Sequence, residues 1–356
     1  MHNSYSIDDL HRTIATIGDD QHLCALAVVM AAEGPVPAKL GSKAVLTSKH
    51  VLSGTIGGGW VEAATLQRVA EALETGHPLV LEFNLAGHAA TEGHPICGGS
   101  LRVLLTPLNH ALCNACRAAA NAAAERQRGV LVTHIRCGGE VTVETEFFLQ
   151  SALASHDGFP DLDMLRQVVT SEQNRLFHCP PDPKGCDAFA LVEPVLPKPL
   201  LLIVGGGHIG QALAMQADGV GFDLAVFDDR PEFTQPELFP NSTALYGGNV
   251  VQQLKTFPCD SDCYIVIATR GHQQDAAALA ACMKQAVAYI GMIGSRRKVA
   301  MLRKELTATG CCTVEQFDRI YAPIGLDIGA ETVPEIAASI VAQLIQVRRT
   351  SHASRL

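Results

Sequence analysis

The sequence predicts an α/β protein in which a doubly wound parallel sheet follows an α+β N-terminal domain. Two patterns carry this prediction. The stretch Leu200–Gly210 reads as a buried strand, a glycine-rich turn and the start of a helix, and beyond Asp229 strands and helices alternate. The length of 356 residues favours two domains. We place the boundary in Leu196–Pro199, where two prolines interrupt regular structure, and expect domains at 1–196 and 197–356.

The turn after Leu200–Val204 carries Gly205, Gly207 and Gly210 in G-x-G-x-x-G register. The three glycines serve a tight turn, a close approach of backbone to pyrophosphate, and close packing of helix on strand. Free N–H groups at the helix start favour an anion, and His208 lies there as a further donor. This pattern is Rossmann-like and predicts a nucleotide-type site. The alternative is a glycine turn that only permits packing.

The strand Phe222–Phe227 ends at Asp228. Asp228 follows the glycines at about the distance in sequence at which an acidic residue binds the ribose hydroxyls of a dinucleotide. Arg230 follows two residues later, and its positive charge would instead suit a ribose that carries a 2′-phosphate. Further strands are expected at Thr243–Gly247, Cys263–Ala268 and Ala286–Ile290, each followed by a helix, with a closing helix at Glu335–Val347.

Ligands of such sheets bind outside the carboxyl ends of the strands. Loops 269–275 and 291–298 should therefore converge with the glycine turn, and their candidate binding residues are Arg270, Gly271, His272, Gly294 and Ser295. Ser295 is also a candidate N-cap. His272 and Asp275 have the spacing of a pair on one helix, although capping is equally available. Residues 296–298 offer positive charge or a solvated helix face.

In the N-terminal half, strands and helices alternate less regularly. We expect helices at 6–18, 60–73 and 109–128, and strands at 23–31, 43–47, 51–56, 79–85, 100–106, 129–135, 141–149 and 188–196.

Three features of this half are candidates for binding. Lys39 lies in a Gly/Pro loop, Gly57, Gly58 and Gly59 precede a helix that carries Glu62, and Cys97 precedes a Gly-Gly pair. Such loops can present backbone N–H groups to an anion, and such a cysteine can be activated as a thiolate. The alternatives are a solvated lysine, a carboxylate that complements the helix dipole, and an ordinary loop thiol.

Composition excludes other classes. The net charge of −9 and a pI near 5.8 argue against a nucleic-acid or membrane-surface binder. No signal peptide or long apolar run is evident, so we expect a cytoplasmic protein, and its twelve cysteines as reduced thiols. Cys113 and Cys116 form a C-x-x-C inside an alanine-rich helix, where packing is the expected role rather than a metal site.

Eight stretches, in order along both halves, resemble the XdhC/CoxI family of accessory proteins for maturation of xanthine dehydrogenase and related molybdenum hydroxylases. They are AVVMAAEGPVPAKLGSKAVL, GTIGGGWVEA, CGG, LIVGGGHIGQALA, VFDDRPEF, IATRGHQQD, YIGMIGSRRK and PIGLDIGAET. Two details depart from the family pattern. Ala38 stands where an arginine is common, which weakens the anion contact expected of the Lys39 loop, and Thr332–Glu335 reads T-V-P-E rather than T-P-E-E.

The resemblance implies a chaperone that binds molybdenum cofactor in its mononucleotide or dinucleotide form, supports its sulfuration and inserts it into a hydroxylase. Partners would be the apo-hydroxylase and a cysteine desulfurase, and we expect a homodimer. Cys97 would be a molybdenum or persulfide contact, and Lys39, Gly57–Gly59 and Glu62 would line its pocket. The chain would be a maturation factor rather than a turnover enzyme.

Two alternatives remain from the residues alone. An NAD(P)-dependent oxidoreductase would use the same glycine turn and Asp228, with Arg270 and His272 as substrate or acid–base groups. A purely structural partner would keep the nucleotide fold without a ligand. The glycine turn would, under the cofactor hypothesis, hold a phosphate tail in a cleft between the domains.

Overall fold

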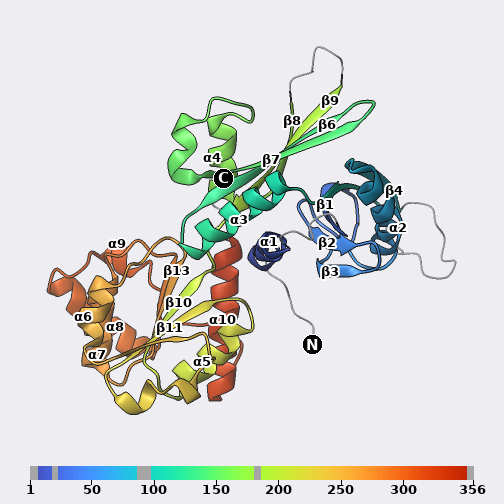
Figure 1. The fold of residues 1–356 in the computed structure, drawn as a ribbon. Helices are drawn as coiled ribbons and strands as arrows, with labels where there is room; N and C mark the ends of the chain where they lie inside the picture. The colour runs from blue at the N-terminus through green and yellow to red at the C-terminus, as the bar shows by residue number, and fades with distance from the viewer. Residues whose placement is uncertain (1–6, 18–22, 86–97, 180–185, 351–356) are drawn as a thin grey trace. The chain divides into compact units, whose positions relative to one another are not determined.

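The computed structural model describes residues 7–17, 23–85, 98–179 and 186–350 (Figure 1). The residues through Pro197 form one compact unit and those from Lys198 form another. Cys97, a predicted site residue, lies outside the described residues.

The C-terminal unit is built on a five-stranded parallel sheet with the order β12-β11-β10-β13-β14. Its strands are β10 (Leu200–Val204), β11 (Asp223–Asp228), β12 (Ala244–Gly247), β13 (Cys263–Ile267) and β14 (Tyr289–Met292). The first strand, β10, therefore lies in the middle of the sheet. The chain adds β11 and β12 on one side of it, then crosses back and adds β13 and β14 on the other side. This is the Rossmann-like, doubly wound arrangement that the sequence predicted.

Helices cover both faces of this sheet (Figure 1). Leu201 and Ile203 of β10 pack with α5 and α10, whereas Leu202 and Val204 pack with the helices of the opposite face. The helices are α5 (His208–Asp218), α6 (Val250–Thr256), α7 (His272–Cys282), α8 (Arg296–Ala308), α9 (Val314–Phe317) and α10 (Val333–Thr350), with short 3₁₀ turns η3 (Pro231–Phe233) and η4 (Pro236–Leu238). A strand buried on both faces explains the continuous apolar run at 200–204.

The N-terminal unit contains two antiparallel sheets, in agreement with the predicted α+β class. The first has the order β3-β2-β1-β5-β4, from β1 (Cys24–Glu33), β2 (Lys43–Thr47), β3 (Val51–Gly54), β4 (Leu79–Asn84) and β5 (Ser100–Pro107). The helix α2 (Gly59–Thr75) packs on one face of this sheet. The other face shares a core with α1 (Ile7–Thr16), α3 (His110–Ala124) and the second sheet.

The second sheet has the order β7-β6-β9-β8, from β6 (Gly129–Cys137), β7 (Val141–Leu149), β8 (Arg175–His178) and β9 (Asp187–Val195). The helix α4 (Leu162–Ser171) and a 3₁₀ turn η2 (Gln150–Ser155) cover part of it. The sequence prediction contained neither α4 nor β8, both of which lie in the stretch that the family resemblance left unmatched.

A buried ion pair joins the two sheets of this unit. Lys43 Nζ of β2 lies 2.7 Å from Glu193 Oε2 of β9, and both side chains are buried. Burial raises the pKa of Glu193, and the nearby lysine acts in the opposite direction.

Two elements of the C-terminal unit differ from prediction. β14 was expected at 286–290 but begins at Tyr289 and continues to Met292, because residues 289–292 pair with β13. The last helix begins at Val333 rather than at Glu335. Within the described ranges, no helix has both the length and the apolar character needed to cross a membrane.

Candidate functional site

The glycine turn after β10 gives each of its predicted glycines a distinct environment. Gly205 has φ +119°, and a Cβ on it would collide with the Ala268 carbonyl oxygen. A Cβ on Gly210 would collide with the Gly205 carbonyl oxygen, so this glycine permits the close contact of α5 with the turn. A Cβ on Gly207 would meet nothing within 4 Å. The turn is therefore tight at both ends and open at Gly207, where no side chain caps α5.

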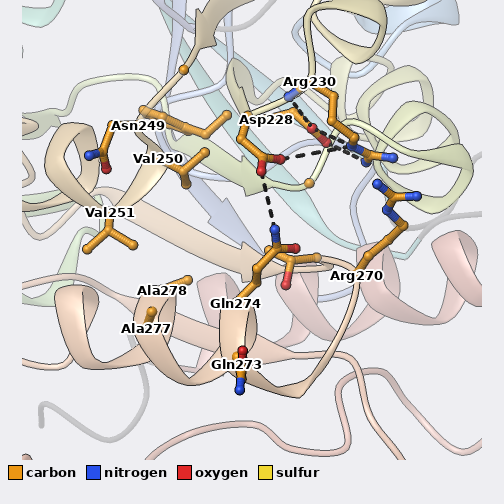
Figure 2. A pocket seen from close by; sticks show the side chains of 15 residues that line it. Asp228, Arg230, Asn249, Val250, Val251, Arg270, Gln273, Gln274, Ala277 and Ala278 are labelled. Atoms are coloured by element: carbon orange, nitrogen blue, oxygen red, sulfur yellow. Dashed lines mark hydrogen bonds and ion pairs between the residues drawn. The ribbon is translucent and has the colours of Figure 1, made fainter.

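The carboxylate of Asp228, at the end of β11, accepts hydrogen bonds from neighbouring groups of the chain. Its Oδ2 accepts a hydrogen bond from Arg230 Nη2 at 2.8 Å, and its Oδ1 accepts one from Arg230 Nε at 2.9 Å (Figure 2). Its Oδ2 also accepts a hydrogen bond from Gly206 N at 2.8 Å. Burial acts to raise the pKa of Asp228, but the bonds from Arg230 and Gly206 outweigh it and hold the pKa below its usual value. Arg230 also covers the Phe233 ring, with its guanidinium carbon 3.8 Å from the ring centroid.

This arrangement changes the interpretation of Asp228. The side chain lies where a ribose-binding acid was expected, yet it is 3% exposed and its carboxylate already fixes both the glycine turn and Arg230. Asp229, the next residue, has an exposed side chain, and its Oδ2 accepts from Gln274 Nε2 at 3.2 Å.

A second carboxylate, Asp275 on α7, ties three segments together. Its Oδ1 accepts from Thr269 Oγ1 at 2.5 Å, and its Oδ2 forms an ion pair with Lys298 of α8. Asp275 is fully buried. The loop after β13 and the start of α8 are therefore joined through one side chain, and Lys298 is not part of a solvated face.

His272 and Asp275, for which pairing and capping were both open, do not pair with each other. His272 Nε2 instead lies 2.8 Å from Glu305 Oε2 on α8, because at the first position of α7 its ring turns toward that helix. Ser295 is confirmed as the N-cap of α8, since its Oγ accepts from Lys298 N at 3.3 Å. Gly294 lies against the stem of Lys298, and Gly271, with φ +98°, caps the start of α7.

A pocket of about 330 Å³ opens at the carboxyl ends of β10, β11, β12 and β13 (Figure 2). Three predicted site residues line it: Gly205, Asp228 and Arg270. The other lining residues are Phe227, Asp229, Arg230, Gly248, Asn249, Val250, Val251, Thr269, Gln273, Gln274, Ala277 and Ala278. Four of these, Gly248, Asn249, Val250 and Val251, were missed because the loop after β12 was not considered. The rule that selected loops at the carboxyl ends of the other strands applies to Gly248 and Asn249 as well.

The remaining predicted residues of this unit lie outside the pocket lining. His208 is exposed and lines a separate, shallower hollow with Met215 of α5 and Val333 and Pro334 of α10. Gly207, Gly210, Gly271, His272, Gly294 and Ser295 belong to neither group of lining residues.

In the N-terminal unit, Gly57 and Gly99 lie close to the loop that precedes Lys39. A Cβ on Gly57 would lie 3.0 Å from Pro37 and 3.2 Å from Ala38, and a Cβ on Gly99 would press on Val36. Gly57, Gly58 and Gly59 all have positive φ, of 116°, 70° and 55°. Gly58 and Gly59 face open space. Lys39, which follows Ala38 in the chain, is exposed.

Glu62 holds this glycine segment in place. Its Oε1 accepts hydrogen bonds from Thr55 Oγ1 at 2.6 Å, Ile56 N at 3.1 Å and Gly58 N at 3.1 Å. The carboxylate therefore does more than complement the dipole of α2. It sets the conformation of the turn from which the helix starts.

The thiols of Cys113 and Cys116 are buried in a hydrophobic core. Burial raises the pKa of Cys113, and raises that of Cys116 to about 12. Both side chains therefore remain protonated thiols near neutral pH. Among the residues that the structure describes, no group of His, Cys, Asp and Glu side chains is arranged to hold a metal ion.

Comparison with known families gives matches in both halves. Residues 201–344 match the XdhC Rossmann domain, and residues 19–84 match the XdhC and CoxI family.

Two curated relatives and one solved structure are similar to this chain. A probable xanthine dehydrogenase subunit of Bacillus subtilis (strain 168) is 25% identical over 350 residues, covering 96% of this chain and 98% of that protein. The Uncharacterized protein YqeB of Escherichia coli (strain K12) is 36% identical over 200 residues, 52% of this chain but only 36% of YqeB. A crystal structure described as a xanthine dehydrogenase from Bacillus halodurans has a TM-score of 0.74 at 22% identity, covering 97% and 96% of the two chains, and shares the fold.

Proposed function

This chain belongs to the XdhC and CoxI family, and on that premise we propose that it is a maturation factor for a molybdenum hydroxylase of the xanthine dehydrogenase type. In this proposal the chain binds molybdenum cofactor, supports its sulfuration and inserts it into the apo-hydroxylase. A cysteine desulfurase supplies the sulfur, and the chain acts in the cytoplasm as a homodimer rather than as a turnover enzyme.

The observation that carries the proposal is the pair of family matches, one in each half and in order along the chain. The name of the Bacillus subtilis relative, which aligns along almost the whole chain, connects that protein with xanthine dehydrogenase. Because the match to YqeB spans little more than a third of that protein, it supports the family assignment and not a shared activity.

The residues of both glycine turns fit the anionic end of such a cofactor. Gly207 precedes α5 and Gly58 precedes α2, neither helix start has a side-chain cap, and neither glycine would bring a Cβ into contact with its surroundings. Uncapped N–H groups at open helix starts favour phosphate oxygens. Lys39, the residue after Ala38, adds a positive charge to the loop that contacts Gly57. When bound, the cofactor would supply the molybdenum centre on which the hydroxylase depends.

A second candidate function is favoured by the pocket in the C-terminal unit. Its place at the carboxyl ends of the strands is typical of NAD(P)-dependent oxidoreductases. The acid–base group assigned to that function was His272, which pairs with Glu305 and does not line the pocket. Arg270 alone provides no proton transfer near neutral pH, so the maturation role is preferred.

The test is to purify the chain from cells that synthesise molybdenum cofactor. Molybdenum is measured by elemental analysis, pterin by fluorescence after oxidation, and NAD(P) by absorbance. We expect molybdenum and pterin in equal amounts, and transfer of both to an apo-hydroxylase with recovery of its activity. Retained NAD(P) with turnover of a small substrate, and no pterin, would contradict the proposal.

The role of Cys97 is tested in the same preparation. We expect Cys97→Ala to lose retained molybdenum and delivery. Cys311→Ala, which removes an exposed thiol of the C-terminal unit, serves as the matched control and should keep both. Unchanged retention and delivery in both variants would remove Cys97 from the site.

A further inference from the structure

The helix α1 docks on the N-terminal unit through a face that includes a histidine. Leu10, His11 and Ile14 are buried, at 3%, 2% and 0% exposure, and their spacing puts them on one side of the helix. The helix packs on α3, β2 and β3, which together form the α1 docking surface. A leucine in the place of His11 would bury apolar surface without burying two polar nitrogens. Packing alone therefore does not account for a histidine at this position.

Two polar groups on this surface are buried without a hydrogen-bond partner. Within the part of the chain that the structure describes, neither Nδ1 nor Nε2 of His11 has one, and neither does the hydroxyl of Ser53 on β3. Ser53 lies opposite Val45, and Val45 belongs to the same core as Leu10 and Ile14, so the hydroxyl faces the core that α1 covers. Unsatisfied polar groups reduce what the docking of α1 gains from apolar burial.

The charge that acts on His11 comes from Lys43 on β2. Lys43 is paired with Glu193 of β9, whose carboxylate is therefore already engaged, and β3 carries no titratable side chain. On α1 itself Arg12 is exposed, and residues 8 and 9 are aspartates that precede His11 in the chain. Among the described residues, burial first and Lys43 second lower the pKa of His11 to about 3, and no carboxylate offsets them. The docked ring is therefore neutral at pH 7.

The helix α3 contributes thiols and an arginine. Cys113 and Cys116 belong to the same core as the buried face of α1, and burial raises the pKa of both thiols. His110, the first residue of α3, is exposed. Arg117 Nη2 donates a hydrogen bond to Ala15 O at 3.3 Å, at the C-terminal end of α1. The thiols and the arginine already carry their protons at pH 7, so these groups do not change charge when the pH falls.

We propose that α1 is an acid-released helix: when the imidazole of His11 takes up a proton, α1 leaves its docking surface while the two sheets of the N-terminal unit stay folded. The step transfers one proton from water to His11 and breaks no covalent bond. In water the ring regains its ordinary pKa of about 6.5, so the released state binds the proton more readily than the docked state. A helix of ten residues is marginal in water without its packing, so the amides of α1 lose their hydrogen bonds on release. Neither molybdenum nor a hydroxylase takes part in this step, which is therefore independent of the proposed function.

The two pKa values of His11 set the direction and the size of the effect. Because the docked pKa of about 3 lies below the released pKa of about 6.5, docking is fully favourable above about pH 6.5 and weakens as the pH falls toward 3. The ratio of released to docked α1 should therefore rise about tenfold from about pH 7.5 to pH 5.5, and about thirtyfold from about pH 7.5 to pH 5.0. Glu193 acts in the opposite direction, because a carboxylate whose pKa is raised by burial binds a proton more readily in the folded chain.

The measurement is hydrogen exchange of the full chain at these three pH values, followed by mass spectrometry and corrected for the intrinsic exchange rate at each pH. We expect the protection of the α1 amides to fall about tenfold at about pH 5.5 and about thirtyfold at about pH 5.0. The amides of β1 and β5, in the middle of the first sheet, should change by less than about twofold. Protection of α1 that does not depend on pH overturns the proposal. An equal loss of protection in α1 and β1 also overturns it, because the whole unit then opens together.

Two variants assign the effect to one ring. His11→Leu and His11→Phe put an apolar side chain that cannot take up a proton in the same place, and the change in α1 protection between about pH 7.5 and pH 5.5 should fall from about tenfold to about onefold. His50→Leu, at an exposed position in the turn between β2 and β3, is the matched control and should keep the tenfold change. A tenfold change that persists in the His11 variants overturns the assignment to His11. The comparison of α1 with β1 in the unchanged chain decides the release itself without either variant.

Discussion

Replacing Gly210 or Gly207 by alanine should separate the structural part of the glycine turn from its binding part. The two glycines are three residues apart and belong to the same motif. A Cβ on Gly210 would collide with the Gly205 carbonyl oxygen and lie 3.3 Å from Ile203 Cγ2. A Cβ on Gly207, where φ is −68°, would meet nothing within 4 Å. The two substitutions therefore have opposite consequences.

The size of each effect follows from these contacts. The clash at Gly210 is with backbone, which cannot swing aside as a side chain can, so overpacking should cost about 1–3 kcal/mol of unfolding free energy. At roughly 2–4 °C per kcal/mol for a unit of this size, the melting temperature should fall by about 2–12 °C. At Gly207 the free energy of unfolding should change by no more than about 0.5 kcal/mol.

Binding should show the reverse pattern. A methyl group on Gly207 lies where an anion would approach the N–H groups of α5, so affinity for inorganic pyrophosphate should fall about tenfold or more. Scanning calorimetry gives the stabilities and titration calorimetry the affinities, and Gly207→Ala serves as the stability control for Gly210→Ala. If Gly207→Ala binds pyrophosphate as tightly as the unchanged chain, the turn is not an anion cradle. If Gly210→Ala melts at the unchanged temperature, the close packing of helix on turn has been misjudged.

Three further outcomes follow from individual side chains. Glu62→Ala should cost about 1–3 kcal/mol and speed hydrogen exchange at the Gly58 amide, because the carboxylate that accepts from that amide is gone; unchanged exchange would show that the turn holds itself. Lys43→Met should destabilise the N-terminal unit by about 3–5 kcal/mol by leaving Glu193 buried without its partner, and adding Glu193→Leu should recover most of the loss in denaturant titrations. Because the folded pKa of Asp228 is depressed, its stabilising contribution is present above the unfolded pKa of about 3.9 and is lost as pH falls through the folded pKa. Asp228→Asn should therefore flatten the decline in stability below about pH 4, and an equally steep decline in that variant would contradict the assignment.

Local patterns were sufficient for the elements that frame the site. The run of apolar residues at 200–204, the glycines behind it and the alternation beyond Asp229 predicted the parallel sheet, since each signal lies within a few residues of the element it describes. The same holds for Ser295, whose capping role depends on residues three positions away. The family resemblance added the maturation role, which no residue pattern supplied.

Contacts between distant segments were not predictable in this way. His272 pairs with Glu305 rather than with Asp275, and Asp275 pairs with Lys298, because the packing of α7 on α8 decides which side chains meet. The pocket at the carboxyl ends of β10, β11, β12 and β13 likewise depends on how α6 and α7 lie against the neighbouring strands. The bonds from Arg230 to Asp228 are local in sequence, yet the spacing rule that selected Asp228 says nothing of where a neighbouring arginine points.

The position of β10 at the middle of its sheet has a consequence for the chain during synthesis. β10 is the first strand of the C-terminal unit to be made, and its partners on the two sides, β11 and β13, follow later, with β13 beginning only at Cys263. Until then one edge of an entirely apolar strand has no partner, and such edges pair with other chains. Fragments that end between β11 and β13 should therefore aggregate on expression, whereas a fragment from Lys198 to the end of α10 carries both partners of β10.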